Sequence, residues 1–199
     1  MTRVLLASRN AKKLAELRRI LAANQVDGVE IVGLADVPDF PEAPETGATF
    51  EENALAKARD AAAATGLPAI ADDSGIAIDA LNGMPGVLSA RWSGTHGDDK
   101  ANLDLVLAQL GDVPDDRRGG GFVCAIALVH PDGTETTLRA DWRGTITREP
   151  AGTNGFGYDP IFRPDGHDCS SAELTPEQKD AISHRGQALR LLLPHLAAL

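Results

Sequence analysis

Two adjacent carboxylates and a hydroxyl, Asp72, Asp73 and Ser74, stand between two apolar runs in the stretch AIADDSGIAI. A buried carboxylate loses its hydration, so it needs a cation, a proton or several hydrogen-bond donors. Both apolar runs resemble buried strands, and successive side chains of an extended segment face opposite sides. We therefore expect one aspartate to be catalytic, holding Mg²⁺ or taking a proton from water, and the other to be structural. The alternative is a turn closed by local side-chain to backbone hydrogen bonds.

The stretch SRNAKK at residues 8–13 follows a strand-like run and enters a predicted helix. The N-terminus of a helix favours phosphate, because its first backbone N–H groups lack helical partners and its dipole is positive there. Ser8 and Asn10 add side-chain donors, and Lys12 or Lys13 adds positive charge. The pattern indicates a phosphate site, although an ordinary helix cap with solvated lysines fits it too. It is neither a P-loop nor a dinucleotide-binding turn.

Two later segments could recognise a planar ligand rich in hydrogen-bond acceptors. TNGFGYDP at 153–160 combines flexible glycines with Phe156 and Tyr158, which could stack on a ring or simply belong to the core. KDAISHRG at 179–186 places Lys179, His184 and Arg185 around a helix start. Cations there oppose the helix dipole, so the pattern favours an external anion or acceptor. The sequence contains no zinc-binding motif and no nucleophile elbow.

The composition narrows the function classes. With 19 Lys and Arg against 29 Asp and Glu, the 199-residue chain carries a formal net charge of −10, which argues against nucleic acid as a partner. A small anionic ligand is compatible with that charge if a metal or a few cations gather at one site. No apolar run reaches the roughly 20 residues of a membrane span, no signal peptide precedes the first strand, and the cysteines show no disulfide spacing. We expect a cytoplasmic protein without a membrane partner.

Alternating helices and strands must position these residues. Apolar periodicity and capping residues predict helices over 11–23, 49–65, 98–110, from 175, and over 183–193. Strands are predicted over 3–7, 30–33, 122–129 and 136–147, in addition to the two runs around Asp72. The last two strands are joined by a hairpin signal at 131–133, and a proline-rich acidic loop lies at 36–47. The order indicates one α/β domain with a mixed sheet.

Four motifs, in this order, resemble the inosine/xanthosine triphosphate pyrophosphatase family: SRNAKK, ADDSG…GMPGVLSARWSG, GTNGFGYDPIF and SAELTPEQKDAISHRGQAL. The likeness spans nearly the whole chain, from residue 4 to about 193. It implies an α/β fold in which an elongated mixed sheet carries flanking helices in two lobes around a central substrate cleft, with a single domain over 1–199. It also implies Mg²⁺-dependent hydrolysis of non-standard purine nucleoside triphosphates (XTP, ITP, dITP) to the monophosphate and pyrophosphate. Such an enzyme acts as a homodimer and keeps these nucleotides out of DNA and RNA.

The resemblance also implies roles for individual residues. Asp73 matches the metal-linked general base, Glu45 is the candidate second carboxylate for the metal, and Ser74 matches a substrate contact. The triphosphate loop corresponds to Ser8, Arg9, Asn10, Ala11, Lys12 and Lys13. The base-enclosing loop corresponds to Phe156, Gly157, Tyr158 and Asp159. The oxo edge of the purine is matched to Lys179, His184 and Arg185.

Other functions fit parts of the same pattern. A nucleotide sensor without turnover would bind the ligand and release no product. A related pyrophosphatase could act on modified pyrimidine or methylated nucleotides. A purely structural role would leave the cations at 179–185 and the aspartates without an explanation.

Overall fold

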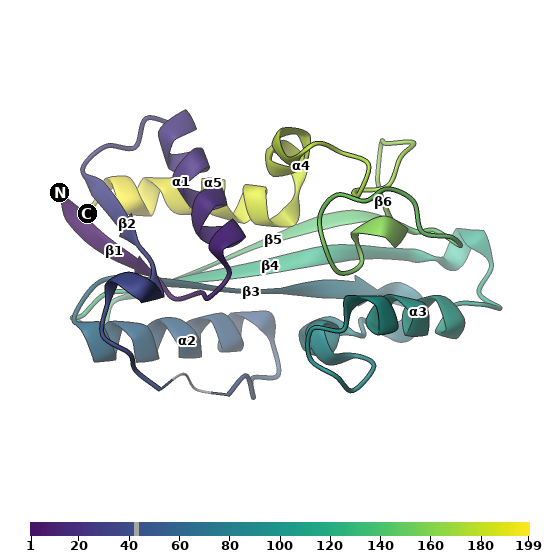
Figure 1. The fold of residues 1–199 in the computed structure, drawn as a ribbon, viewed down its shortest axis with the longest axis horizontal. Helices are drawn as coiled ribbons and strands as arrows, with labels where there is room; N and C mark the ends of the chain where they lie inside the picture. Colours follow the sequence, from purple (N-terminus) through teal and green to yellow (C-terminus); the bar gives the residue numbers. More distant parts are fainter. Residues whose placement is uncertain (42–43) are drawn as a thin grey trace. The chain divides into compact units, whose positions relative to one another are not determined.

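A mixed six-stranded sheet, in the order β2-β1-β3-β4-β5-β6, is the framework of the chain (Figure 1). In the computed structural model, which describes residues 1–41 and 44–199, the strands are β1 (Thr2–Leu6), β2 (Val29–Val32), β3 (Ala69–Ile78), β4 (Gly119–Val129), β5 (Glu135–Ile146) and β6 (Phe162–Pro164). β1 pairs in parallel with both β2 and β3, whereas β5 and β6 are antiparallel. The α/β class and the mixed sheet expected from the sequence are confirmed.

The helices begin and end close to their predicted residues. They are α1 (Ala11–Ala23), α2 (Phe50–Thr65), α3 (Asp99–Gln109), α4 (Pro176–Ile182) and α5 (His184–Ala197). Short 3-10 turns lie at Leu34–Asp36, Asp79–Leu81, Gly86–Arg91, Asp115–Arg117 and Asp159–Ile161. Thr49 caps α2 by accepting from the Glu52 N–H, and Gly66 ends it at a φ of 68°. Local capping chemistry therefore fixed these boundaries.

The observed elements differ from the expected ones at three places. The two apolar runs around Asp72 and Asp73 form one ten-residue strand, β3, so the turn alternative is excluded. β6 follows a glycine-rich loop and has only three residues, too few for an alternating pattern to show. α5 continues past the predicted end at Leu193 although Pro194 lies inside it. Leu192 and Leu196 are fully buried, and this burial outweighs the one helical hydrogen bond that proline removes.

The chain divides into two compact units, each with its own core. Unit 1 comprises 1–73, 124–140 and 185–199, and unit 2 comprises 74–123 and 141–184. In unit 1, α1 and α5 lie on one side of the strands and α2 on the other (Figure 1). The core on the side of α1 and α5 contains Val4, Leu6, Leu17, Ile20, Leu21, Ile31, Ile70, Cys124, Ile126, Leu128, Ala140, Ala188, Leu189, Leu192 and Leu196. The chain ends also meet in unit 1, where the Thr2 hydroxyl donates to the carbonyl of Leu199 at 3.2 Å.

Unit 2 has a core in which aliphatic residues of β3 and α3 meet aromatic residues. Its members are Ile76, Ile78, Leu103, Val106, Leu110, Phe122, Trp142, Ile146, Tyr158, Ile161, Phe162 and Leu174. Arg118 is buried beside this core, and its guanidinium donates to the carbonyls of Leu110, Ile146 and Thr147. Among the described residues, no helix is both long enough and apolar enough to span a bilayer.

Candidate active site

The alternation of β3 sends its two adjacent aspartates to opposite faces of the sheet. Ile70 belongs to the core under α1 and α5. Because side chains two residues apart share a face, Asp72 points to that same side and Asp73 points to the side of α2. Their hydrogen-bond partners come from these different helices. The expectation that the two carboxylates cannot share one side of the strand is confirmed.

Asp72 is paired with two cations. Its Oδ2 atom lies 2.6 Å from Lys13 Nζ and 2.5 Å from Arg185 Nη1, and only 3% of the residue is exposed. Arg185 also donates through Nε to Glu16 Oε2 at 2.6 Å. Burial favours the neutral acid, but Arg185 and Lys13 outweigh it and hold the pKa of Asp72 well below its usual range. Asp72 therefore favours its charged form and joins α1 and α5 to β3 through its two ion pairs.

The negative charge of Asp73 is balanced less closely than that of Asp72. Its Oδ2 accepts from Asn53 Nδ2 at 2.9 Å, and its Oδ1 lies 3.7 Å from Lys57 Nζ. Lys57 is shared, because its ammonium also donates to Glu45 Oε1 at 2.8 Å. Burial raises the pKa of Asp73 above its usual value, although Lys57 and Asn53 act in the opposite direction. Asp73 is thus better suited than Asp72 to accept a proton near neutral pH.

Asn53 also fixes the loop before α2. Its Oδ1 accepts from the backbone N–H of Gly47 at 2.7 Å while its amide group donates to Asp73. A Cβ at Gly47 would stand 2.6 Å from Asn53 Oδ1, so only glycine lets the backbone approach this closely. The loop that contains Glu45 is therefore anchored to the same amide that contacts Asp73.

A divalent metal fits the face of β3 that carries Asp73. Glu45 and Asp73 already share one cation, the ammonium of Lys57. Mg²⁺ is typically held by one or two carboxylates together with phosphates of the substrate and water. Within residues 1–41 and 44–199, no group of three or more His, Cys, Asp or Glu side chains forms a complete metal cage. Two carboxylates that share one cation match the number of protein carboxylates that Mg²⁺ typically uses beside phosphate and water.

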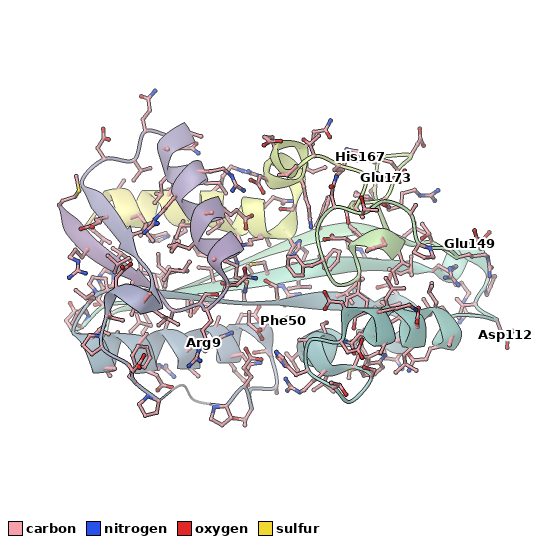
Figure 2. All side chains as sticks on the ribbon, in the orientation of Figure 1. Arg9, Phe50, Asp112, Glu149, His167 and Glu173 are labelled. Atoms are coloured by element: carbon pink, nitrogen blue, oxygen red, sulfur yellow. The ribbon has the colours of Figure 1, made fainter. Side chains whose placement is uncertain are left out.

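The residues of the expected triphosphate loop lie between β1 and the first turns of α1. Ser8 Oγ accepts from the N–H of Asn10 at 3.2 Å, which shapes the turn into the helix. Arg9, labelled in Figure 2, is exposed. It lines a cavity of about 220 Å³ together with residues of 34–40. Ala11 opens α1, and Lys13 is engaged with Asp72 as described. The side chain of Lys12 lies outside the described residues, as do Glu42 and Ala43 of the acidic loop.

The glycine-rich loop of unit 2 contains two aromatic residues with different environments. Phe156 is 57% exposed, and the ammonium of Lys179 lies 5.5 Å from the centre of its ring. Tyr158 is 4% exposed, belongs to the core, and donates its hydroxyl to the carbonyl of Ser89 at 2.7 Å. The N–H of Gly157 between them donates to Asp99 Oδ2 at 2.9 Å. Phe156 is the aromatic ring of this loop that is available for stacking.

The cations at 179–185 occupy three separate environments. Lys179 pairs with Asp159, and Arg185 is buried against Asp72 and Glu16 of unit 1. His184 stacks on Phe122 with ring centres 4.8 Å apart and planes at 12°, and on Trp142 at 6.1 Å and 20°. Ser74 has a buried hydroxyl without a hydrogen-bond partner among the described residues. A role for these four side chains at a substrate stays a prediction.

Asn53 and Lys57 were missed at the sequence level. Both lie in the alanine-rich helix α2, where the buried residues include Ala54, Ala58 and Ala61. Residues four apart share a helix face. The amide of Asn53 and the ammonium of Lys57, both beside the alanine face, could therefore have indicated a pair of polar side chains directed at one site. The alanine-rich pattern by itself predicts only a helix over 49–65.

Comparisons with known proteins agree with this picture. The Ham1 family model matches residues 4–195. A dITP/XTP pyrophosphatase of Nocardia farcinica is 74% identical over 199 residues, which is 100% of this chain and 97% of the relative. One of Mycobacterium tuberculosis (strain ATCC 25618 / H37Rv) is 61% identical over 199 residues, with 100% and 97% covered.

Two solved structures share the fold. The crystal structure of a nucleoside-triphosphatase / dITP/XTP pyrophosphatase from Mycobacterium abscessus is 63% identical and superposes with a TM-score of 0.82, covering 98% of this chain and 100% of that one. A HAM1 protein from Coxiella burnetii is 44% identical with a TM-score of 0.90, covering 100% of both chains. The likeness that the four motifs indicated is confirmed, and the chain belongs to the Ham1 family.

Proposed function

We propose that this protein hydrolyses the bond between the α and β phosphates of non-standard purine nucleoside triphosphates, releasing the monophosphate and pyrophosphate. Relatives at 61–74% identity carry the name dITP/XTP pyrophosphatase. The observation that carries the proposal is the unequal pairing of the two adjacent carboxylates: Asp72 contacts two cations, whereas Asp73 shares one lysine with Glu45. Neighbouring carboxylates whose environments separate their pKa values divide into a permanent charge and a proton acceptor.

Asp73 accepts the proton of the attacking water in this proposal. Burial keeps its basicity above that of an ordinary carboxylate, and the amide of Asn53 holds it in one orientation. Asp73 and Glu45 would hold Mg²⁺, which when bound neutralises phosphate charge and polarises the phosphoryl group. Lys57 keeps the two carboxylates compatible with each other while no metal is bound. Hydrolysis then needs no covalent intermediate with the protein.

The remaining residues bind the substrate. Ser8, Asn10 and Lys13 supply donors and charge for the triphosphate, whose roughly four negative charges an acidic protein accepts only with such partners. Phe156 provides the stacking surface for the base, and Lys179 donates to its carbonyl. Adenine presents an amino group where hypoxanthine and xanthine present that carbonyl, so a lysine donor would meet another donor. A mismatch of this kind discriminates strongly between bases.

The test is product release from XTP, dITP, ITP, GTP, ATP and a pyrimidine triphosphate, with Mg²⁺ and with a chelator. We expect metal-dependent monophosphate and pyrophosphate from the oxo purines, little turnover of ATP, and recovery of activity when Mg²⁺ is restored. Orthophosphate as the product, or equal rates on all substrates, would overturn the proposal. Tight binding without any product would identify a sensor, and a preference for modified pyrimidines would identify the related pyrophosphatase. The homodimer and the cytoplasmic location implied by the resemblance stay predictions.

A further inference from the structure

Asp159 is a buried carboxylate that accepts hydrogen bonds from three different residues of unit 2. Only 2% of the residue is exposed. Its Oδ2 accepts from Lys179 Nζ at 2.5 Å and from the backbone N–H of Phe156 at 2.9 Å. Its Oδ1 accepts from the Ser171 hydroxyl at 2.7 Å. The carboxylate therefore joins the glycine-rich loop, helix α4 and the segment before α4 within unit 2.

Lys179 owes its location to this carboxylate. Oδ2 receives both the ammonium of Lys179 and the N–H of Phe156, so one oxygen sets the position of the cation and of the residue whose ring lies beneath it. The backbone of Gly155 closes the other side, because a Cβ there would stand 2.1 Å from Asp159 Oδ2. A rotation of the carboxylate would displace the oxygen that holds both the ammonium and the N–H of Phe156.

Ser171 is the side chain that opposes this rotation. It is fully buried, and its own N–H donates to the carbonyl of Phe162 at 2.8 Å, so its backbone is fixed. Its single hydroxyl proton has two possible acceptors on Asp159, Oδ1 at 2.7 Å and the carbonyl at 3.2 Å. The shorter contact and the charge of the carboxylate favour Oδ1. Removing the hydroxyl takes away the one donor to Oδ1 found among the described residues, in a side chain that is almost fully buried.

We propose that Ser171 is a positioning residue for base recognition, which holds the Asp159 carboxylate and through it the Lys179 ammonium against the Phe156 ring. The proposal rests on the proposed function, because it assumes that Lys179 and Phe156 receive the base. Among the described residues, the Ser171 hydroxyl donates only to Asp159, so it acts on Lys179 and Phe156 through that carboxylate. It thus tunes selectivity for the base without contributing to the cleavage step.

The test compares Ser171→Ala with Ser170→Ala. Ser170 is also buried, at 3% exposure, but its hydroxyl donates to the backbone carbonyl of Ala151 and its N–H to Glu173, which Figure 2 labels. The control therefore removes a buried serine hydroxyl from the same loop without touching Asp159. We expect Ser171→Ala to raise KM for XTP and the Kd of xanthosine monophosphate by about tenfold, the effect of one buried hydrogen bond, with little change in kcat. Inhibition by inorganic pyrophosphate, which lacks a base, should not change.

A double mutant separates positioning from a general loss of stability. If Ser171 acts through Lys179, Ser171→Ala should have no further effect on monophosphate binding in a Lys179→Met background. Equal effects of the two serine substitutions, additive effects with Lys179→Met, or an equal loss of pyrophosphate inhibition would each overturn the positioning role. A wild type that releases no monophosphate from XTP overturns the proposed function instead. The Kd values for xanthosine monophosphate then decide the role of Ser171 without turnover.

Discussion

The two faces of β3 each carry one buried aspartate, and the two aspartates have opposite pKa shifts. On the face toward α1 and α5, Asp72 contacts Lys13 and Arg185 at 2.5–2.6 Å and has a strongly lowered pKa. On the face toward α2, Asp73 shares one lysine with Glu45 and has a raised pKa. Both residues are buried, so burial alone does not separate them. The balance between carboxylates and cations on each face makes one residue structural and leaves the other able to exchange a proton.

The largest expected effect is on turnover. Asp73→Asn keeps an oxygen that can accept from Asn53 but removes the proposed proton acceptor and one of the two proposed metal ligands. We expect kcat with XTP to fall by about 10³-fold or more, since loss of a general base alone accounts for about 10²–10⁴. Nucleotide binding, measured by calorimetry, should persist. The control is Asp79→Asn, which removes an exposed carboxylate paired with Arg143. Turnover of Asp73→Asn within tenfold of the wild type would remove Asp73 from the chemistry.

The substitution on the other face should affect stability instead. Asp72→Asn leaves Lys13 and Arg185 without their shared carboxylate, and Arg185 is only 7% exposed. Breaking a buried pair by removing one partner is strongly destabilising, so we expect a loss of about 3 kcal/mol in the free energy of unfolding. Urea titration of this variant beside Asp104→Asn, which breaks the exposed pair with Lys100, provides the comparison. Equal midpoints for the two variants would contradict a structural role for Asp72.

Lys57 should set the pH dependence on the Asp73 face. Lys57→Met removes the cation that lowers the pKa of Asp73, so that pKa should rise further. A base works in its ionised form, and the acidic limb of the kcat/KM profile should therefore move to higher pH. We expect activity at pH 7 to fall by roughly tenfold. Lys100→Met removes an exposed lysine and should leave the profile in place. An unmoved limb in Lys57→Met would mean that Asp73 does not set it.

The smallest expected effect is the change in the free energy of unfolding caused by Asp73→Asn. Its sign should be opposite to the change caused by Asp72→Asn. A raised pKa in the folded protein means that ionised Asp73 opposes folding at a pH above that value. Asp73→Asn should therefore stabilise the protein slightly at pH 7. This difference should shrink as the pH falls through the folded pKa and vanish below the unfolded value, where both side chains are neutral. Thermal unfolding across this range is the measurement, and a destabilised Asp73→Asn at pH 7 would contradict it.

The sequence by itself determined the α/β class, most helix boundaries and which side chains are able to bind a ligand or take part in a reaction. Thr49, Gly66 and Thr175 act through contacts within a few residues, so their capping roles are visible in the local pattern. The alternation of an extended segment likewise predicted that Asp72 and Asp73 would separate. The motifs identified the family because specific residue types occur in a fixed order along nearly the whole chain.

The tertiary structure decided which aspartate has its negative charge neutralised by cations, and which residues supply those cations. Arg185 lies 113 residues from Asp72 along the chain, and Asn53 lies 20 residues from Asp73, in a different element. No local pattern specifies those pairings, because they depend on which helices cover each face of β3. The same reason explains why Phe156 and Tyr158 differ in exposure. Both lie in one glycine-rich stretch, and only the packing of unit 2 buries the ring of Tyr158 and leaves the ring of Phe156 exposed. Side-chain types are local information, whereas burial and charge balance arise only when distant segments pack together.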